Sequence, residues 1–445
     1  MTTSNPSVTA AQASAGQRRR QARRIYAASF IGTTVEFYDF IAFGTAASLV
    51  FGKVFFASTS PVVGTIASFA TLAIGYAARP LGGIIGGHFG DKVGRKSVLI
   101  WTMALMGTST FLIGLLPSSG QIGSLAPILL VVLRLVQGLA VGGEWGGAVL
   151  MSVEHAKESN RGFFGSATGV GSGCGVLLAY TAFGALGGLG EDQFLKWGWR
   201  LPFLASGVLI AIGLYIRLRV EESPVFQAER GRSEAARTPA RSPLLAVVRE
   251  RPVRLLIGIG VYAGPFMAQA IITTFLISYA TTKFGLPRQV LLDGLIVSLA
   301  GMLVTVPLFA WLSDKIGRRT VYIPATLLFG AFAFAAFPMV GTGSPLAITA
   351  VFVISMTFLN GATVGIVGSL LSELFPTRYR YTGASVSYQF AGLIGGGIGP
   401  LVASVLAETG AGVTAVSLMI AVFCVVSAVC AGVLGDTRKV DLHQA

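Results

Sequence analysis

The decamer GHFGDKVGRK at residues 87–96 has a close copy, AWLSDKIGRR, at residues 310–319. Aligning Asp91 with Asp314 places the two copies 223 residues apart, about half of the chain. Each copy carries one acidic and three basic side chains in a short Gly-containing turn, and each stands between two long apolar segments. A turn so densely charged belongs at a membrane surface. Its recurrence at half the chain length indicates a duplicated membrane unit.

The composition is typical of a membrane protein. The 445 residues are 53% hydrophobic and only 12% charged, with a mean hydropathy of +0.73. Many windows exceed the roughly 18 apolar residues that span a bilayer. A net charge of +14 could suggest nucleic-acid binding, but the bases lie mainly in connections, where they set membrane orientation. The three cysteines lie in apolar stretches, so neither a disulfide framework nor a metal site is expected.

The apolar segments predict twelve spans, six in each half: residues 25–50, 62–89, 97–116, 126–152, 162–189, 199–219, 253–281, 290–312, 320–341, 346–374, 382–407 and 411–434. They divide the chain into five parts: a cytoplasmic N-terminal tail (1–24), a first six-helix half (25–219), a cytoplasmic linker (220–252), a second six-helix half (253–434) and a cytoplasmic C-terminal tail (435–445). Residues 1–17 are polar and lack the apolar core of a signal peptide, so we expect a disordered segment there.

Lysine and arginine predict the orientation. Of the 33, 26 lie in the tails and the even-numbered connections between spans, and five lie in the odd-numbered connections. Because an excess of positive charge marks the cytoplasmic side, both termini are expected in the cytoplasm and the chain in the cell membrane.

Glycine recurs every four residues in several spans, as at Gly138, Gly142 and Gly146. This spacing places a small face on one side of a helix and lets neighbouring helices cross closely. No Gly-Lys-Ser/Thr phosphate loop occurs, so any transport against a gradient would draw on an ion gradient rather than on ATP.

Ionisable residues inside a span are costly, so they carry functional information. Spans 1, 2 and 4 contain six buried polar candidates: Glu36, Asp39, Arg79, Arg134, Gln137 and Glu144. Glu36 and Asp39 stand three residues apart and share a helix face. Arg134 has no basic counterpart in the second half, where Thr357 stands at the same offset of 223. Salt bridges that only hold helices together are the alternative interpretation of these residues.

The second half offers neutral polar groups instead: Tyr262, Gln269, Asn360 and Gln389. For each of these side chains two roles remain as alternatives: binding the substrate, or only packing between helices. After spans 4 and 10, Glu154 with Arg161 and Glu373 with Arg380 repeat at an offset of 219. Their pattern is that of ion-pair positions at the cytoplasmic surface, which hold or gate the two halves.

The spacing GxxxDxxGR[RK] is similar to the loop 2–3 signature of the major facilitator superfamily. The first copy meets it at Gly87, Asp91, Gly94, Arg95 and Lys96; in the second, Ala310 replaces the first glycine, while Asp314, Gly317, Arg318 and Arg319 match. RxxQG at residues 134–138 resembles another superfamily motif, which is linked to the coupling of proton and substrate transport. EFYDFIAFGTAASLVF, RLVQGLAVGGEWGGAVLMSVEHA and ELFPTRYRYTG resemble the metabolite:proton symporter family within the superfamily.

The resemblance implies an all-α membrane protein, with twelve transmembrane helices in two pseudo-symmetric six-helix halves. It implies import of small organic acids, or of proline and betaine, together with protons. It also implies that Asp91 lies near the start of span 11, at about Thr382, while the cytoplasmic side is closed. Ala310 in the second copy suggests a less close contact at Asp314. The short C-terminal tail is unlike the long coiled coil of osmosensing members and favours an organic acid.

We therefore expect proton-coupled import of a small organic acid by alternating access between the halves. The expected substrate-binding residues are Arg79, Arg134, Gln137, Tyr262, Gln269, Asn360 and Gln389. The residues expected to carry the proton are Glu36, Asp39 and Glu144. The expected cytoplasmic gate comprises Asp91, Gly94, Arg95, Glu154, Arg161, Asp314, Gly317, Arg318, Glu373 and Arg380.

Two other functions remain open: proton-coupled uptake of a zwitterion such as proline or betaine, and a membrane sensor that binds without transporting. An enzyme is not expected, because the chain carries no catalytic constellation. The expected partners are the small substrate, protons and the lipid bilayer, with no nucleic acid, no cofactor and no metal. The protein is expected to function as a monomer.

Overall fold

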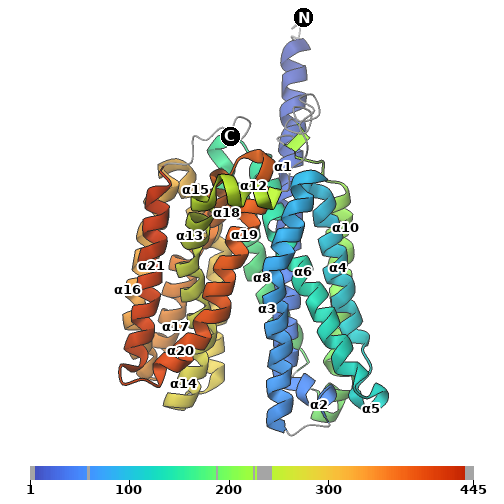
Figure 1. Cartoon of the computed structure of the whole chain (residues 1–445), viewed down its shortest axis with the longest axis vertical. Coiled ribbons are helices and arrows are strands. Elements are labelled where there is room, and N and C mark those ends of the chain that lie inside the picture. Colours follow the sequence, from blue (N-terminus) through green and yellow to red (C-terminus); the bar gives the residue numbers. More distant parts are fainter. Residues whose placement is uncertain (1–5, 58–60, 187–188, 224–225, 228–242, 436–445) are drawn as a thin grey trace, which may run out of the picture.

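The computed structural model describes residues 6–57, 61–186, 189–223, 226–227 and 243–435. All regular structure in this part of the chain is helical (Figure 1).

The first half contains α1 (Pro6–Ala46), η1 (Ala47–Phe51), α2 (Gly52–Val54), α3 (Pro61–Lys92), α4 (Arg95–Leu115), α5 (Ser119–Ile122), α6 (Leu125–Glu154), η2 (Glu158–Asn160), α7 (Arg161–Gly165), α8 (Ala167–Gly184), α9 (Glu191–Gln193), η3 (Phe194–Gly198) and α10 (Arg200–Leu218). The second half follows the linker helix α12 (Pro243–Glu250). It contains α13 (Pro252–Ala270), η4 (Ile271–Phe275), α14 (Leu276–Phe284), α15 (Arg288–Ile316), α16 (Arg318–Gly341), α17 (Pro345–Phe352), η5 (Val353–Asn360), α18 (Gly361–Leu374), η6 (Thr377–Tyr379), α19 (Arg380–Gly392), η7 (Leu393–Ile398), α20 (Gly399–Ala407) and α21 (Gly412–Val433).

Eleven helical stretches among the described residues are long and apolar enough to cross a membrane. The remaining predicted span coincides with α3, a helix of 32 residues. In both decamers a glycine with positive φ forms the turn between two helices: Gly94 (φ 122°) before α4 and Gly317 (φ 115°) before α16. An L side chain rarely adopts this conformation, which explains why both copies have glycine there.

The N-terminal tail differs from the sequence-based expectation where the structure describes it. Helix α1 begins at Pro6, so residues 6–17 are helical rather than disordered. Proline suits the first position of a helix, and the alanine, glutamine and arginine that follow are good helix formers. The linker contains the helix α12, and its residues 228–242 lie outside the described part, as do residues 436–445 of the C-terminal tail.

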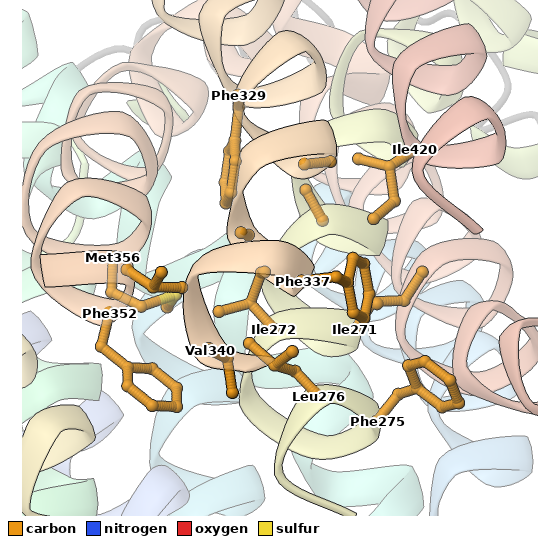
Figure 2. Close-up of a cluster of buried hydrophobic side chains, with 14 of the residues drawn as sticks. Ile271, Ile272, Phe275, Leu276, Phe329, Phe337, Val340, Phe352, Met356 and Ile420 are labelled. Atoms are coloured by element: carbon orange, nitrogen blue, oxygen red, sulfur yellow. The ribbon is translucent and has the colours of Figure 1, made fainter. Parts of the chain in front are cut away.

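Each half has its own apolar core. Phe43, Phe51, Phe55, Trp199 and Phe203 pack together in the first half. Figure 2 shows the larger core of the second half, where η4, α16 and α21 contribute Ile271, Phe337 and Ile420. A further apolar cluster joins the two halves: it includes Trp145 and Val149 of α6 together with Tyr262 of α13 and Leu371 of α18.

The halves meet where α3 and α6 cross α19 and where α7 and α8 lie along α15. Glycine permits the closest approach: a Cβ on Gly87 of α3 would lie 2.6 Å from the Cα of Thr382 in α19. We call the end of the bundle that holds Asp91 and Asp314 the charged end; α12 packs there against α3, α19 and η6 (Figure 1). The halves are thus joined directly at the charged end.

Candidate functional site

Asp91, in the last turn of α3, binds the first turn of α19 in the other half. Its Oδ1 accepts a hydrogen bond from the amide of Tyr381 (3.1 Å), and its Oδ2 accepts from the amide (3.0 Å) and hydroxyl (2.8 Å) of Thr382. The carboxylate is fully buried. It satisfies amides that a helix N-terminus leaves free, and the helix dipole favours its negative charge. The predicted position of Asp91 is confirmed.

Glu154 at the end of α6 ties the two halves together at the charged end. Its Oε1 lies 3.4 Å from Nη2 of Arg95 and 3.1 Å from Nη1 of Arg380, which begins α19. The hydroxyl of Ser223 donates to its other oxygen. All three charged side chains are fully buried. Glu154 therefore pairs across the interface between the halves.

The second decamer makes a matching contact in the opposite direction. Oδ1 of Asp314 accepts a hydrogen bond from the amide of Gly162 (2.8 Å), and Oδ2 accepts from the amide of Phe163 (2.9 Å), in the first turn of α7. Arg318 lies 2.7 Å from Asp314 and 3.2 Å from Glu373. Arg161, which begins α7, is buried and lies 3.8 Å from Glu158.

The expectation of a looser contact at Asp314 is wrong. Its two amide contacts are no longer than those of Asp91. The small residue at this crossing is supplied by the other helix: a Cβ on Gly162 would lie 2.7 Å from the carbonyl oxygen of Ala310. A methyl group on α15 is tolerated because the glycine lies on α7.

Five of the predicted residues line one small cavity inside the first half: Glu36, Asp39, Arg79, Arg134 and Gln137. They come from α1, α3 and α6. Oε2 of Glu36 and Oδ1 of Asp39 are buried without a hydrogen-bond partner among the described residues. Buried polar atoms normally have a partner, so these two oxygens are available for a proton or a ligand.

A chain of hydrogen bonds connects the acid and the base of this cavity. Nη1 of Arg134 donates to Oε1 of Gln137 (3.1 Å), and Nε2 of Gln137 donates to the hydroxyl of Thr110 (2.5 Å). That hydroxyl donates to Oδ2 of Asp39 (2.6 Å). Thr110, in α4, was not among the predicted residues. A lone threonine in an apolar span gives no signal, because its hydroxyl commonly donates to the carbonyl one turn back; for Thr110 that carbonyl, of Met106, is the alternative acceptor at 2.9 Å.

Aromatic rings hold both arginines of the cavity. The guanidinium carbon of Arg79 lies 4.7 Å from the ring centre of Phe40 and 4.8 Å from that of Tyr76. The guanidinium carbon of Arg134 lies 4.0 Å from the ring centre of Phe43. Within the described part of the chain, neither arginine has a carboxylate oxygen within 4.0 Å. Cation–π contacts stabilise the positive charge and leave its hydrogen-bond donors available.

Glu144 lies elsewhere. It is fully buried and forms an ion pair with Arg217 near the end of α10, whose guanidinium also donates to the carbonyl oxygen of Leu99 (2.5 Å). Arg217 was not predicted, because it stands at the end of span 6 among bases that were assigned to the cytoplasmic connection. Glu144 is not among the residues that line the cavity of Glu36 and Asp39.

The four polar candidates of the second half do not line this cavity. Tyr262 stacks on Tyr388, with ring centres 5.4 Å apart, and Tyr388 stacks on Trp145 of α6 at 3.6 Å. Nε2 of Gln389 donates to the carbonyl oxygen of Gly142 (3.1 Å), again across the halves. Asn360 is buried beside the sulfur of Met302, and the Gln269 side chain is half-buried.

A bundle of membrane-crossing helices in two halves, with ionisable side chains gathered in its interior, defines a multi-pass membrane transporter. The chain belongs to the Major Facilitator Superfamily, whose family model matches residues 29–400 and 301–444. The predicted twelve-helix fold and the predicted family are confirmed. The protein is a transporter and not an enzyme, and transporters of this superfamily need no cofactor.

The chain is similar over most of its length to named transporters. It is 41% identical to the shikimate transporter of Escherichia coli (strain K12) over 422 residues, which cover 94% of this chain and 96% of the relative. It is 34% identical to the proline/betaine transporter of Salmonella typhimurium over 398 residues, covering 87% and 78%. A solved structure of the proton:xylose symporter XylE, bound to 6-bromo-6-deoxy-D-glucose, matches with a TM-score of 0.74, 17% identity and coverage of 93% and 95%.

Proposed function

We propose that the protein imports a small organic acid together with protons, by alternating access between its halves. The observation that carries this proposal is the cavity shared by Glu36, Asp39, Arg79 and Arg134. Among the described residues, the guanidinium groups of Arg79 and Arg134 have no carboxylate oxygen within 4.0 Å. Such a pair of positive charges suits the carboxylate of a substrate, since a guanidinium can bind it through two parallel hydrogen bonds. The two acids beside them can accept a proton. Gln137 orients Arg134.

Proton and substrate binding are linked through the chain of hydrogen bonds. While Asp39 is ionised, Thr110 and Gln137 connect it to Arg134. Protonation of Asp39 weakens this connection and frees the guanidinium for a substrate anion. By thermodynamic reciprocity, a bound anion then raises the affinity for the proton by the same factor. Glu144, which is paired with Arg217 inside the first half, serves as a secondary acid.

The charged end is the cytoplasmic gate, and the structure corresponds to its closed state. Asp91 with α19 and Asp314 with α7 close it from both sides, and Arg95, Glu154, Arg161, Arg318, Glu373 and Arg380 complete the buried charges. Gly94 and Gly317 fix the turns that position these groups. Opening this end requires every contact across the halves to break, which releases substrate and proton to the cytoplasm.

The remaining polar groups of the second half complete the substrate site when the halves close around the substrate. Tyr262 and Gln389 already lie at the interface with α6, and Gln269 and Asn360 lie deeper in the second half. The two halves, 25–219 and 253–434, move as rigid units joined by the linker 220–252, and a monomer suffices for transport. Both termini lie in the cytoplasm.

The relatives narrow the substrate. Since one of them is named a shikimate transporter, a hydroxylated cyclic acid is the first candidate, and the rings of Phe40 and Tyr76 beside Arg79 suit such a ring. The second candidate is a zwitterion such as proline or betaine, which the relatives of 32–34% identity are named for. A zwitterion needs an anionic partner for its cation, which Glu36 could provide.

Uptake into proteoliposomes tests the proposal. Labelled shikimate, 2-oxoglutarate, citrate and proline are supplied with and without an inward proton gradient. The expected result is accumulation of one acid above its external concentration only with the gradient, and its loss in Asp39→Asn. Accumulation that is indifferent to the gradient, or that proceeds with proline alone, would overturn the proposal. For orientation, an impermeant maleimide should label Ser118→Cys but not Ser233→Cys in intact cells; residue 233 lies outside the described part.

A further inference from the structure

An open groove runs along the outer face of the first half, between α3, α4 and α6. It has a volume of about 510 Å³. Its floor is formed by Gly82 and Gly86 of α3 and Gly143 of α6, at a crossing so close that a Cβ on Gly86 would lie 2.5 Å from the Cα of Gly143. Helices without side chains at their crossing leave a hollow on the outer side.

The walls of the groove are apolar and open to the surroundings of the bundle. Trp101 has 69% of its surface exposed, Phe89 52%, and Leu105 and Ile85 49% each. All four lie on helices that cross the membrane, so at this depth the surroundings are the hydrocarbon chains of lipids. An apolar groove at this depth is filled by an acyl chain or by another helix.

The end of the groove nearest the charged end carries a positive charge. The groove reaches Val93 and Ser97 there, and Lys92, in the last turn of α3, is exposed between the groove lining and the turn. The neighbouring charges are bound elsewhere. Asp91 binds the start of α19, the carboxylate of Glu222 accepts hydrogen bonds from the first amides of α4, and the ammonium of Lys96 donates to the carbonyl oxygen of Leu218 (3.1 Å). Lys92 is thus the base available to a group seated at this end.

We propose that the groove is a binding site for an anionic phospholipid, with one acyl chain between α3, α4 and α6 and its phosphate at Lys92 and Ser97. The charge selects the occupant. A basic side chain attracts an anionic headgroup at the membrane surface, where each such residue contributes about fivefold in affinity. The apolar walls below it accept the chain without requiring any polar partner. This site is separate from the transport cavity.

Quenching of tryptophan fluorescence by brominated lipid tests the site. Trp101 lines the groove, and Trp311, also exposed on a membrane-crossing helix near the charged end, stands outside it. Because the ammonium of Lys315 lies 4.3 Å from the ring centre of Trp311, this control also carries Lys315→Gln, which removes the base that would attract anionic lipid to it. Variants that retain only Trp101, or only Trp311 with Lys315→Gln, are reconstituted in zwitterionic phosphatidylcholine with increasing brominated phosphatidylglycerol. Quenching of Trp101 should saturate at a low mole fraction, whereas quenching of Trp311 should rise in proportion to the brominated lipid.

Two substitutions and a second method make the result decisive. Lys92→Gln should shift the saturation of Trp101 to about fivefold more phosphatidylglycerol, and Leu105→Phe should weaken it by filling the groove. Leu112→Phe, two helical turns further on the same face of α4, is the matched control and should leave it unchanged. Native mass spectrometry of the unmodified chain should show one retained phosphatidylglycerol per protein. In Lys92→Gln a smaller fraction of the protein should retain this lipid. The proposal would be overturned if the two tryptophans gave the same quenching curve, or if Lys92→Gln left the saturation of Trp101 unchanged. A dimer that shields Trp101 from lipid would also overturn it.

Discussion

Loss of the carboxylate of Asp91 should open the charged end. In Asp91→Asn one oxygen remains as an acceptor, while the other becomes an amide that cannot accept from the first turn of α19. One buried backbone amide then loses its partner, at a cost of about 1–3 kcal/mol, and the favourable interaction of a negative charge with the helix end disappears. A total of about 2 kcal/mol corresponds to a thirtyfold shift of the population towards the open state.

The opening can be followed with a cysteine that is buried only in the closed state. Ser385 of α19 is fully buried. Its hydroxyl lies so close to Gly146 of α6 that a Cβ added to this glycine would be 2.0 Å from the hydroxyl oxygen. Ser385→Cys is introduced after replacement of Cys174, Cys424 and Cys430 by serine, and its reaction with a maleimide is timed in detergent. The expected result is labelling about thirtyfold faster in Asp91→Asn, with uptake slowed and substrate affinity little changed.

Asp314 gives the sharpest check of this reasoning. Since its amide contacts are as short as those of Asp91, Asp314→Asn should accelerate labelling to within about threefold of the first variant. A cysteine at Thr409, exposed between α20 and α21, should react at one rate in all variants. Labelling of Ser385→Cys at the original rate in Asp91→Asn, or a response in only one of the two variants, would refute the gate.

Two further predictions concern the buried polar groups of the first half. Thr110→Val keeps the shape of the side chain but breaks the hydrogen-bonded connection between Asp39 and Gln137, so concentrative uptake should fall about tenfold. Thr110→Ser keeps the hydroxyl and should transport normally. Equal uptake by the two variants would contradict the role of the hydroxyl. Arg217→Gln leaves the charge of Glu144 buried and unpaired, which costs about 3–5 kcal/mol, so the thermal unfolding midpoint should fall by several degrees. Adding Glu144→Gln should restore much of it; no fall in the single variant would show that the pair is not formed.

The sequence was sufficient for the fold, whereas the contact at Asp91 was expected only from the resemblance of its decamer to the superfamily signature. Long apolar segments require helices in a membrane, and two charged turns half a chain apart fix the duplication. Glu36 and Asp39 could be singled out because an acid inside a span is costly wherever it points. These inferences hold without knowledge of which helices are neighbours.

The partners could not be predicted, because they depend on that knowledge. Arg217 looked like one more surface base until α10 was placed beside α4 and α6. The substitution of Ala310 for glycine looked like a weakened contact, because a single sequence does not show that Gly162 supplies the missing space. A close helix crossing needs one small residue, and either helix can provide it.

The two Asp contacts run in opposite directions, and this reciprocity determines how the gate opens. Asp91 belongs to the first half and binds the second, whereas Asp314 belongs to the second half and binds the first. A rigid rocking of one half cannot lengthen one contact and preserve the other, so the two contributions of about 2 kcal/mol add in the closed state and vanish together. The buried charges of the transport cavity, in contrast, lie in the first half alone. In the proposed mechanism, a symmetric gate therefore encloses an asymmetric site: the second half is needed to close the path, while the first half holds the proton and the anion that bias the closure.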